Sequence, residues 1–503
     1  MNKNLMIQGT ASSVGKSILT AAFCRIFYKD GYRVAPFKSQ NMDLNSFVTE
    51  DGLEMGRAQV VQAMACNRKP VVQMNPILMK PSTDKRAQII LEGKVHESMD
   101  AQDFFRFKPV LKEMIMNNYR YLAESSDVVV IEGAGSPAEI NLKTDDIVNM
   151  GLAEMVDAPV ILVADIDRGG VFASIAGTLL LLDENERERI KGVIINKFRG
   201  DVKLLEPGLK MLEDIIKKPV LGVIPYMNVD IEDEDSVTDR FSQKGRKEFN
   251  INIAVIRTPY MSNFTDFDAF AMYEDVNLRY VTSRDEFGDP DVIILPGSKT
   301  TIYDLSFIRN SGLEEKVIRH SRNGGLVIGI CGGFQMLGTK IEDPCQVEGK
   351  VTQINGLGLL DISTVMQPDK VTRQVSLEID TSVSAIFAEL ENKTVKGYEI
   401  HMGKTTGNVE KIAFAYNENQ VSGVVKENVI GTYIHGIFDN CNFTDAILNK
   451  IRKQKNLAPG FSGQSFEDYR NSQFDILEQT VRDNVDVKAV YRILEGEDVE
   501  CRY

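Results

Sequence analysis

Short apolar runs that alternate with helical stretches are the feature that most restricts the fold of this 503-residue chain. In the first half each run is four to six residues long and rich in β-branched residues. Strands that are apolar on both faces are typical of parallel sheets covered by helices on both sides. The runs are Leu5–Gln8, Arg33–Phe37, Asp127–Ile131, Pro159–Ala164, Gly192–Asn196 and Pro219–Ile224. They predict an open, doubly wound α/β domain.

The second half restarts this pattern after an acidic and polar stretch. Its expected strands are Ile251–Ile256, Asp291–Leu295 and Leu326–Ile330. Beyond about residue 345 the pattern shifts toward β structure, and the last part of the chain is amphipathic and helical. We therefore predict an α/β fold with two doubly wound domains. The predicted divisions are a first domain at 1–230, a linker at 231–250, a second domain at 251–443 and a C-terminal helical extension at 444–503.

Charge and cysteine usage exclude several classes of partner. The chain has 58 Lys and Arg against 72 Asp and Glu, a net charge of −14, which disfavours nucleic acids and anionic membrane surfaces. No apolar run reaches the roughly 18–20 residues that cross a bilayer, and no signal peptide is expected. The six cysteines are scattered without a CxxC pair, as in reduced cytoplasmic proteins. We expect a cytoplasmic protein and leave its oligomeric state open.

The residues directly after the first expected strand form a glycine loop, which reads Gly-Thr-Ala-Ser-Ser-Val-Gly-Lys-Ser from Gly9 to Ser17. Small residues let backbone N–H groups converge on phosphate oxygens, while Lys and Ser supply contacts to phosphate and Mg²⁺. Five residues separate Gly9 from Gly15, one more than in the common phosphate loop. A chance glycine-rich turn is the alternative. We predict an ATP site formed by Gly9, Thr10, Gly15, Lys16 and Ser17.

Polar residues follow several expected strands where a Mg²⁺–nucleotide site would need them. Ligands of open α/β sheets bind at the carboxyl ends of the strands. Glu132, followed by a run of small residues, is the preferred Mg²⁺ ligand together with Ser17. Asp165 and Asp167 are weaker candidates, because a carboxylate at a strand end also caps helices. Asn196 is a candidate contact to the adenine base.

A second chemical signal lies at Cys331, where an apolar strand ends among glycines and a helix follows. A nucleophile elbow requires such small neighbours, and a helix N-terminus favours the thiolate. The N–H of Gly332 can donate to an oxyanion, and we expect a second donor at Gly297, in the turn that ends the preceding strand. A buried inert thiol is the alternative, and the Gly-x-Cys-Gly-Gly setting favours the nucleophile.

A nucleophilic cysteine needs a base, and the chain has four histidines. His435 lies at the end of a short strand-like run and is the preferred base. His401, in a Gly-Tyr-Glu-Ile-His-Met-Gly stretch, is the second candidate. Either histidine could instead have a structural role.

One stretch of the first half is basic although the chain as a whole is acidic. From Arg57 to Lys94 there are seven basic and two acidic residues, a local excess of +5. An ordinary solvated face is one interpretation. The functional interpretation is a binding patch for an anionic substrate.

A nucleotide site and a Cys–His site in one chain indicate glutamine hydrolysis coupled to ATP-driven amidation. The second half resembles triad (class I) glutamine amidotransferases, and the first half resembles dethiobiotin-synthetase-like ATPases, whose loop has the spacing seen here. Over nearly its whole length the chain resembles the cobyric acid synthase family. The strings that carry this resemblance are Ala35–Ser46, Met74–Pro81, Glu132–Asn141, Asp146–Gly151, Ala164–Phe172 and Asn196–Asp201.

The resemblance implies amidation of the b, d, e and g carboxylates of adenosylcobyrinate a,c-diamide, with glutamine as nitrogen donor and ATP and Mg²⁺ as cofactors. Cys331 would attack glutamine, and His435 would move the proton. Ammonia would pass internally to the first domain and displace phosphate from an acyl phosphate. The resemblance also implies a set of substrate-binding residues. These are Gln40, Asn41, Arg57 and Asp146.

The chain departs from the wider amidotransferase pattern beside the histidine. Many triad glutaminases carry a glutamate two residues after it, whereas this chain has Ile437. Asp439 could take that role, or a Cys–His dyad could suffice.

Two other functions are compatible with parts of this pattern. Cobyrinate a,c-diamide synthase shares both domains, but the Gln40–Met42 and Asp146–Gly151 strings favour the first family. A P-loop ATPase switch with a non-catalytic amidotransferase-like module is disfavoured by the intact Cys331 and His435.

Overall fold

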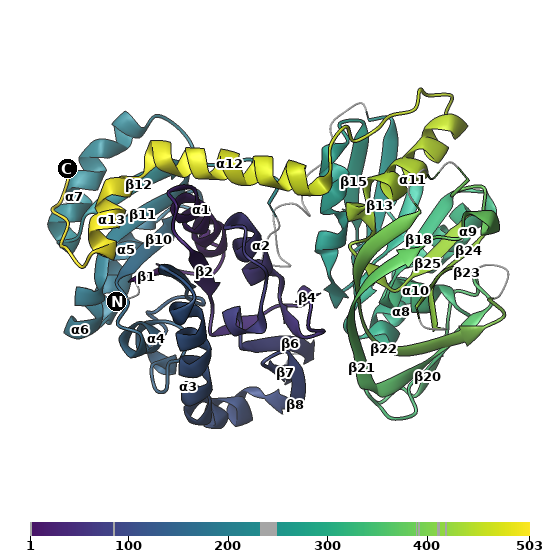
Figure 1. The fold of residues 1–503 in the computed structure, drawn as a ribbon, viewed down its shortest axis with the longest axis horizontal. Coiled ribbons are helices and arrows are strands. Elements are labelled where there is room, and N and C mark those ends of the chain that lie inside the picture. The colour runs from purple at the N-terminus through teal and green to yellow at the C-terminus, as the bar shows by residue number, and fades with distance from the viewer. Residues whose placement is uncertain are drawn as a thin grey trace.

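The computed structural model describes residues 3–83, 86–231, 249–388, 390, 393–409, 413–417 and 420–503. Positions 232–248 of the predicted linker, and Asp84 and Lys85 of the basic stretch, lie outside the described residues. Two α/β domains lie side by side, and one long helix runs between them (Figure 1). The expectation of two α/β domains is confirmed.

The first domain is built on a six-stranded sheet in which all neighbours are parallel. In spatial order the strands are β12 (Val220–Pro225), β11 (Ile190–Phe198), β10 (Val160–Asp165), β1 (Lys3–Gly9), β9 (Val128–Glu132) and β2 (Val34–Phe37). The chain fills the side of β2 and β9 first and then crosses to the side of β10. The carboxyl end of β1 therefore lies at the switch point of the sheet, where α/β proteins bind ligands.

Helices cover both faces of this sheet, which explains its continuous apolar strands. Because side chains alternate along a strand, Leu5 and Ile7 pack on one face, and Met6 packs on the other. The helices of the domain are α1 (Lys16–Lys29), α2 (Arg57–Ala65), α3 (Ala101–Glu124), α4 (Met150–Met155), α5 (Val171–Leu181), α6 (Glu184–Arg189) and α7 (Val202–Ile216).

A smaller β structure is inserted between β2 and β9. It contains a four-stranded sheet in the order β3-β6-β7-β8 and a separate antiparallel pair of strands. The sheet consists of β3 (Gln40–Met42), β6 (Ile77–Thr83), β7 (Arg86–Leu91) and β8 (Lys94–Asp100). The pair consists of β4 (Ser46–Val48) and β5 (Glu54–Gly56). This insertion faces the second domain (Figure 1).

The second domain has a seven-stranded sheet in which the first five strands are parallel and the last two pairings, β25 with β24 and β24 with β23, are antiparallel. In spatial order these are β15 (Val276–Val281), β13 (Ile251–Ile256), β16 (Val292–Leu295), β18 (Leu326–Ile330), β25 (Val429–Thr432), β24 (Gln420–Lys426) and β23 (Ala413–Asn417). The helices are α8 (Thr301–Asn310), α9 (Leu313–Arg322), α10 (Gly332–Leu337) and α11 (Cys441–Gln454).

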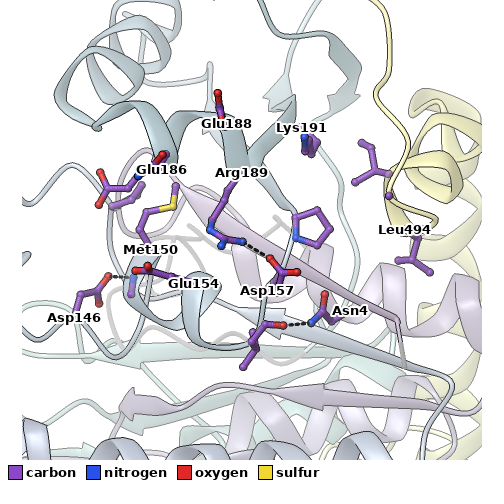
Figure 2. Close-up of a pocket in the computed structure, with 18 of the residues that line it drawn as sticks. Asn4, Asp146, Met150, Glu154, Asp157, Glu186, Glu188, Arg189, Lys191 and Leu494 are labelled. Carbon is purple, nitrogen blue, oxygen red and sulfur yellow. Dashed lines mark hydrogen bonds and ion pairs between the residues drawn. The ribbon is translucent and has the colours of Figure 1, made fainter. Parts of the chain in front are cut away.

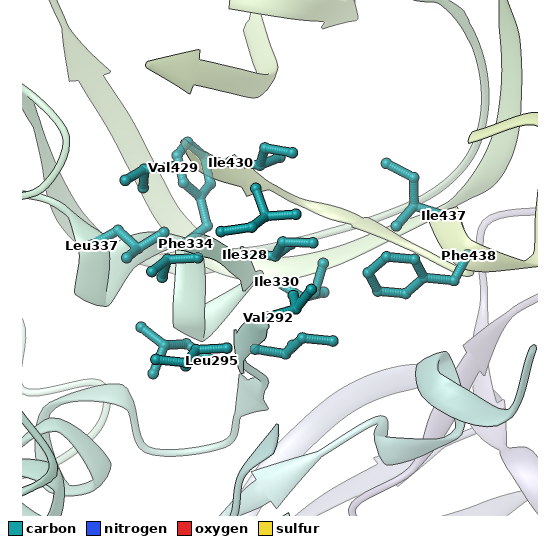
Figure 3. Close-up of a cluster of buried hydrophobic side chains, with 14 of the residues drawn as sticks. Val292, Leu295, Ile328, Ile330, Phe334, Leu337, Val429, Ile430, Ile437 and Phe438 are labelled. Carbon is teal, nitrogen blue, oxygen red and sulfur yellow. The ribbon is translucent and has the colours of Figure 1, made fainter. Parts of the chain in front are cut away.

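Short α10 packs directly on β18, and this contact fixes the turn between them. Figure 3 shows Phe334 and Leu337 of α10 against Ile328 and Ile330 of β18, all of them nearly fully buried. A further five-stranded sheet flanks this core. Its strands are β20 (Gln353–Asn355), β19 (Lys340–Glu342), β21 (Ile362–Glu378), β22 (Thr394–Gly407) and β26 (Ile434–His435).

The C-terminal helices return to the first domain. Helix α12 (Phe466–Asn484) begins beside the second domain and crosses to the first, and α13 (Val487–Leu494) follows it there (Figure 1). Leu477 and Val481 are buried in the same cluster as Phe23 of α1, and Arg25 pairs with Asp475 at 2.7 Å. In the described part of the chain, no helix combines the length and apolar character of a membrane span.

Candidate active sites

The glycine loop lies at the carboxyl end of β1 and leads into α1. Gly9 is the last residue of β1, and the N–H of Thr10 donates to the carbonyl of Val163 at 2.9 Å. Gly15 has a φ of +103°, and a Cβ atom there would lie 2.1 Å from the Asn196 side chain. Glycine is thus required at position 15 both by backbone conformation and by space.

Side chains from the loop and from β11 hold the loop in shape. The Nζ of Lys16 donates to the carbonyl of Ala11 at 3.0 Å. Asn196 Nδ2 donates to the carbonyl of Val14 at 2.9 Å, and Lys197 donates to another loop carbonyl at 2.7 Å. Within the described residues, the buried Oδ1 of Asn196 has no hydrogen-bond partner. Asn196, the predicted contact to the adenine base, therefore stabilises the loop through its Nδ2, and its Oδ1 is an acceptor without a partner among the described residues.

Glu132 is the centre of a buried polar cluster beside the loop. Its carboxylate accepts from Ser17 Oγ at 2.7 Å and pairs with Lys38 Nζ at 2.9 Å. Its second oxygen accepts from the amides of Gln62 and Gln59, the latter at 3.5 Å. The structure thus brings together Ser17 and Glu132, the two residues that the sequence suggests as Mg²⁺ ligands. A hydroxyl and a carboxylate are ligands that Mg²⁺ takes together with phosphate oxygens and water.

Three members of this cluster were missed by the sequence reasoning. Lys38 directly follows β2, so the rule that ligands bind at strand carboxyl ends could have found it. Gln59 and Gln62 lie three residues apart on α2, a spacing that places them on one helix face. No strand-end motif marks that pair.

The weaker carboxylate candidates are engaged in ion pairs. Asp165 lies 3.2 Å from Lys197, and Asp167 lies 2.9 Å from Arg199. Among the described residues, no group of three or more His, Cys, Asp or Glu side chains could hold a metal ion. A cation at this site would therefore depend on Ser17, Glu132 and the nucleotide itself.

Three of the predicted substrate residues lie near the Glu132 cluster. Asn41 Nδ2 donates to the Oε1 of Gln59 at 3.2 Å. The buried Oε1 of Gln40 has no hydrogen-bond partner in the part of the chain that the structure describes. Arg57 is buried at the start of α2, with its guanidinium 5.3 Å from the centre of the Phe47 ring.

Asp146 has a different local setting. Its carboxylate accepts from the backbone N–H groups of Val148, Asn149 and Gly151 at 2.9–3.1 Å. It lines a cavity of about 1430 Å³ at the edge of the sheet where β1 and β11 begin, opposite the glycine loop (Figure 2). The observed contacts of Asp146 are those of a residue that orders the start of α4.

Basic residues of the 57–94 stretch are largely engaged within the protein. Lys80 is buried and pairs with Glu54 at 3.1 Å. Lys69 pairs with Glu50, and Arg68 donates to backbone and hydroxyl oxygens. These three side chains therefore form ion pairs and hydrogen bonds within the protein.

In the second domain, Cys331 occupies a strained turn between β18 and α10. Its φ of 50° and ψ of −104° are unusual for a non-glycine residue. Cβ atoms added at Gly332 and Gly333 would lie 2.8 Å from the Ser298 backbone and 2.0 Å from the Leu295 backbone. Only small neighbours therefore fit, as the nucleophile-elbow interpretation requires.

His435 faces Cys331 and is held by a carboxylate. Its Nδ1 lies 2.7 Å from Asp266 Oδ2, and the other oxygen of Asp266 accepts from the N–H of Gly436 at 2.9 Å. Tyr398 stacks on the imidazole with ring centroids 5.3 Å apart. Burial lowers the pKa of His435, but Asp266 and a hydrogen bond with Cys331 outweigh this effect and raise the value to about 10.

Asp266 is the third member of this site. It is 169 residues from His435 in sequence, and it lies on the 3-10 helix η4 (Phe264–Met272). Sequence reasoning considered Asp439 or a dyad, because no motif links Asp266 to the histidine. Cys331, His435 and Asp266 together have the nucleophile–base–orienter arrangement of a catalytic triad.

His401, the second candidate base, lies in the same pocket with other partners. Its Nδ1 is 2.9 Å from the carbonyl of Gly403, and its ring stacks on Tyr433 at 3.8 Å between centroids. Burial lowers the pKa of His401 to about 4, although Glu399 acts in the opposite direction. The imidazole is therefore neutral at physiological pH.

The two expected oxyanion-hole glycines are adjacent to this triad. Gly332 directly follows Cys331 and abuts the backbone of Ser298, which follows Gly297. A Cβ at Gly297 would lie 3.3 Å from the His435 ring. The geometry thus places Gly332 next to Cys331 in the chain and Gly297 against the ring of His435.

Residues of the first domain directly contact η4, the 3-10 helix that carries Asp266. Asn45 Oδ1 accepts from the N–H of Phe264 at 3.0 Å. Ser46 and Asn263 exchange two hydrogen bonds through the Ser46 backbone, both at 3.2 Å. The helix that carries Asp266 is therefore fixed at its first turn by the first domain.

A buried charge cluster also crosses the interface. Glu54 of the first domain pairs with Lys80 and with Lys370 of the second domain. Burial raises the pKa of Glu54, but Lys370 and Lys80 outweigh this effect and lower it to about 2. The two domains are therefore joined by ionised groups close to the Cys331 pocket.

Fold and sites together define a class: a P-loop nucleotide-binding domain fused to a triad-type glutamine amidotransferase domain. Residues 5–236 match the CobQ/CobB/MinD/ParA nucleotide binding domain, and residues 252–443 match the CobB/CobQ-like glutamine amidotransferase domain.

Curated relatives narrow the class to one family. The chain is 54% identical to the cobyric acid synthase of Alkaliphilus metalliredigens, over 98% of this chain and 100% of that protein. It is 51% identical to the cobyric acid synthase of Thermoanaerobacter sp., over 98% and 99% of the two chains. The chain belongs to the cobyric acid synthase family.

Proposed function

We propose that this chain converts the b, d, e and g carboxylates of adenosylcobyrinate a,c-diamide into carboxamides, with glutamine as nitrogen donor and one ATP per amide. Family membership makes it an amidating enzyme of cobalamin biosynthesis. The observation that carries the proposal is the Cys331–His435–Asp266 arrangement in the same chain as the Ser17–Glu132 cluster. All six cysteines are free, which fits a reducing compartment such as the cytoplasm.

In the second domain the triad would release ammonia from glutamine. The raised pKa of His435 keeps the imidazole protonated at neutral pH, so a positive charge faces the sulfur of the nucleophile. A neighbouring cation makes cysteine sulfur more reactive. The thiolate adds to the side-chain amide carbon, and the N–H groups at Gly332 and Gly297 stabilise the oxyanion. His435 then gives its proton to the departing ammonia. Water hydrolyses the resulting thioester to glutamate and restores the thiol.

In the first domain ATP would activate a corrin carboxylate, because a carboxylate anion is a poor electrophile. The loop amides and Lys16 would hold the phosphates, and Ser17 with Glu132 would hold Mg²⁺. The bound cation would neutralise phosphate charge. The corrin carboxylate attacks the γ-phosphorus and ADP leaves, which gives an acyl phosphate. Ammonia then replaces phosphate at the acyl carbon.

The test is the mass of the corrin after incubation with ATP, Mg²⁺ and glutamine. Each amidation replaces one hydroxyl by one amino group, so four successive mass steps are expected with the a,c-diamide as acceptor. If cobyrinate itself gained amides at its a and c positions and the a,c-diamide gained none, the diamide synthase function would hold instead. Absence of amide formation with either acceptor would contradict both.

A further inference from the structure

The pocket at Cys331 contains two oppositely charged side chains that the triad chemistry does not use. Lys299 follows Ser298 in the turn after β16, and Glu348 lies between β19 and β20. Both line one small cavity together with Cys331, His435 and Gln335. A cation and an anion thus face the space where the amide donor must lie.

Lys299 differs from the other lysines of this cavity. Lys80 and Lys370 share the carboxylate of Glu54, and Lys80 also donates to Ser46 Oγ at 2.9 Å. The half-buried ammonium of Lys299 has neither a hydrogen bond nor an ion pair with any residue that the structure describes. Lys299 is therefore a basic side chain of the pocket that feels Glu348 and Glu54 only at longer range, without a direct contact among the described residues.

Glu348 is held in place and keeps capacity for a further contact. Its Oε2 accepts from the N–H of Ile302, in the first turn of α8, at 3.1 Å. Glu348 and Lys299 attract each other electrostatically, but they form no ion pair within the described chain. The backbone and side chain of Thr301 also bond to this carboxylate. A carboxylate has about four lone-pair positions, so one position is left for a further donor.

Burial shifts the pKa of each of these two groups toward its neutral form. Burial lowers the pKa of Lys299 to about 7, and Lys370 and Lys80 act in the same direction. Burial raises the pKa of Glu348 to about 7, against the opposing effect of the N–H groups of Ile302 and Thr301. A ligand with a carboxylate and an ammonium group would compensate both charges.

We propose that Lys299 binds the α-carboxylate and Glu348 the α-ammonium of glutamine, so that this pair selects the free amino acid as amide donor. The inference rests on the proposed function, since it assigns the head-group subsite of the Cys331 pocket. Glutamine carries both charges on one carbon, and its side chain carries the amide to the thiol. The contacts of Lys299 and Glu348 therefore select the amide donor and also set how far its side-chain amide extends toward Cys331.

The test compares three amide donors with the full-length enzyme, ATP, Mg²⁺ and the corrin acceptor. L-glutamine has both charges, L-glutaminamide lacks the α-carboxylate, and glutaramate lacks the α-ammonium group. The variants are Lys299→Met and Glu348→Gln, and Lys340→Met is the matched control, because Lys340 pairs with Glu342 away from this cavity. Amide formation in the corrin gives kcat and KM for each donor.

Lys299→Met should raise KM for glutamine by about tenfold to hundredfold, the effect of losing one charge-assisted contact, with a much smaller change in kcat. Its preference for glutamine over L-glutaminamide should fall by the same factor, while its preference over glutaramate persists. Glu348→Gln should show the reverse selectivity, and Lys340→Met should match the wild type.

Outcomes that overturn the inference are distinct from those that overturn the function. If the wild type uses glutamine but Lys299→Met keeps the wild-type discrimination against L-glutaminamide, Lys299 does not bind the α-carboxylate. If the wild type uses ammonia but no amide donor, the proposed glutaminase function itself is wrong. Ammonia-dependent amidation reports that each variant is folded, and Lys299→Gln replaces Lys299→Met if that activity is lost.

Discussion

Replacing Asp266 by asparagine tests the triad most directly, because it keeps the shape of the side chain and removes its charge. The pKa of His435 stands at about 10 against an ordinary value of 6.5. At about 1.4 kcal/mol per tenfold change, the difference corresponds to about 5 kcal/mol in favour of the imidazolium. Burial of His435 favours the neutral imidazole. Among the interactions that favour the imidazolium, the charge of Asp266 contributes most. Most of the stabilisation should therefore disappear in Asp266→Asn.

The expected kinetic result is a loss of about 10³–10⁴-fold in kcat for glutamine-dependent amidation, as for other triads that lose their carboxylate. Ammonia-dependent amidation should be retained, because it bypasses Cys331 and His435. Asp439→Asn is the matched control, since Asp439 was the carboxylate suggested by sequence position alone. It should lower glutamine-dependent activity less than threefold.

The pH dependence gives a second measurement with a defined sign. A histidine whose folded pKa is raised stabilises the fold fully below pH 6.5 and loses that contribution as pH rises through about 10. The same proton keeps the imidazole of His435 positively charged beside Cys331, so the alkaline limb of the glutaminase profile should lie near pH 10 in the wild type. In Asp266→Asn it should move toward pH 6.5. An unmoved limb, or equal losses in Asp266→Asn and Asp439→Asn, would refute the assignment.

Four further substitutions probe the two sites, the domain interface and the docking of α12. Cys331→Ala should abolish amidation from glutamine and retain amidation from ammonia, as measured by the mass of the corrin. Lys16→Ala should abolish both reactions. If the Cys331→Ala enzyme still used glutamine, Cys331 would not be the nucleophile. Asn45→Ala removes the buried hydrogen bond to the first turn of η4, the helix that carries Asp266. It should lower glutamine-dependent activity about tenfold without affecting the ammonia reaction. Equal losses in both reactions would contradict a role of Asn45 in positioning Asp266. Leu477→Ala should lower the free energy of unfolding of the first domain by about 2–5 kcal/mol in denaturant titrations, because this fully buried side chain packs in its core, and a change within error would mean that α12 is not docked there.

The sequence was sufficient to predict those features that depend on consecutive residues. The glycine loop from Gly9 to Ser17 and the Cys331 turn are recognisable because their chemistry depends on backbone conformations that neighbouring small residues allow. The parallel sheets were predictable for a similar reason, since strands covered on both faces leave continuous apolar runs. Glu132 was found because strand ends converge at one edge of a sheet.

The remaining parts of the site depend on contacts between distant segments. Asp266 reaches His435 across 169 residues, and Gln62 reaches Glu132 across 70. The string around Asp146 matched the family, yet its carboxylate binds backbone N–H groups at the start of α4. A matched string identifies a residue but not the partner that the fold gives it.

The net charge of −14 also says nothing of how the charges are arranged. Glu54, Lys80 and Lys370 form one buried cluster between the domains, while Lys299 faces the Cys331 pocket without such a partner among the described residues. By itself, the sequence determined the two α/β domains, the glycine loop and the turn at Cys331, because local backbone and apolar patterns encode them. Only the tertiary structure decided the partners of His435, Glu132 and the buried lysines, because these arise from the packing of segments that are far apart in the chain.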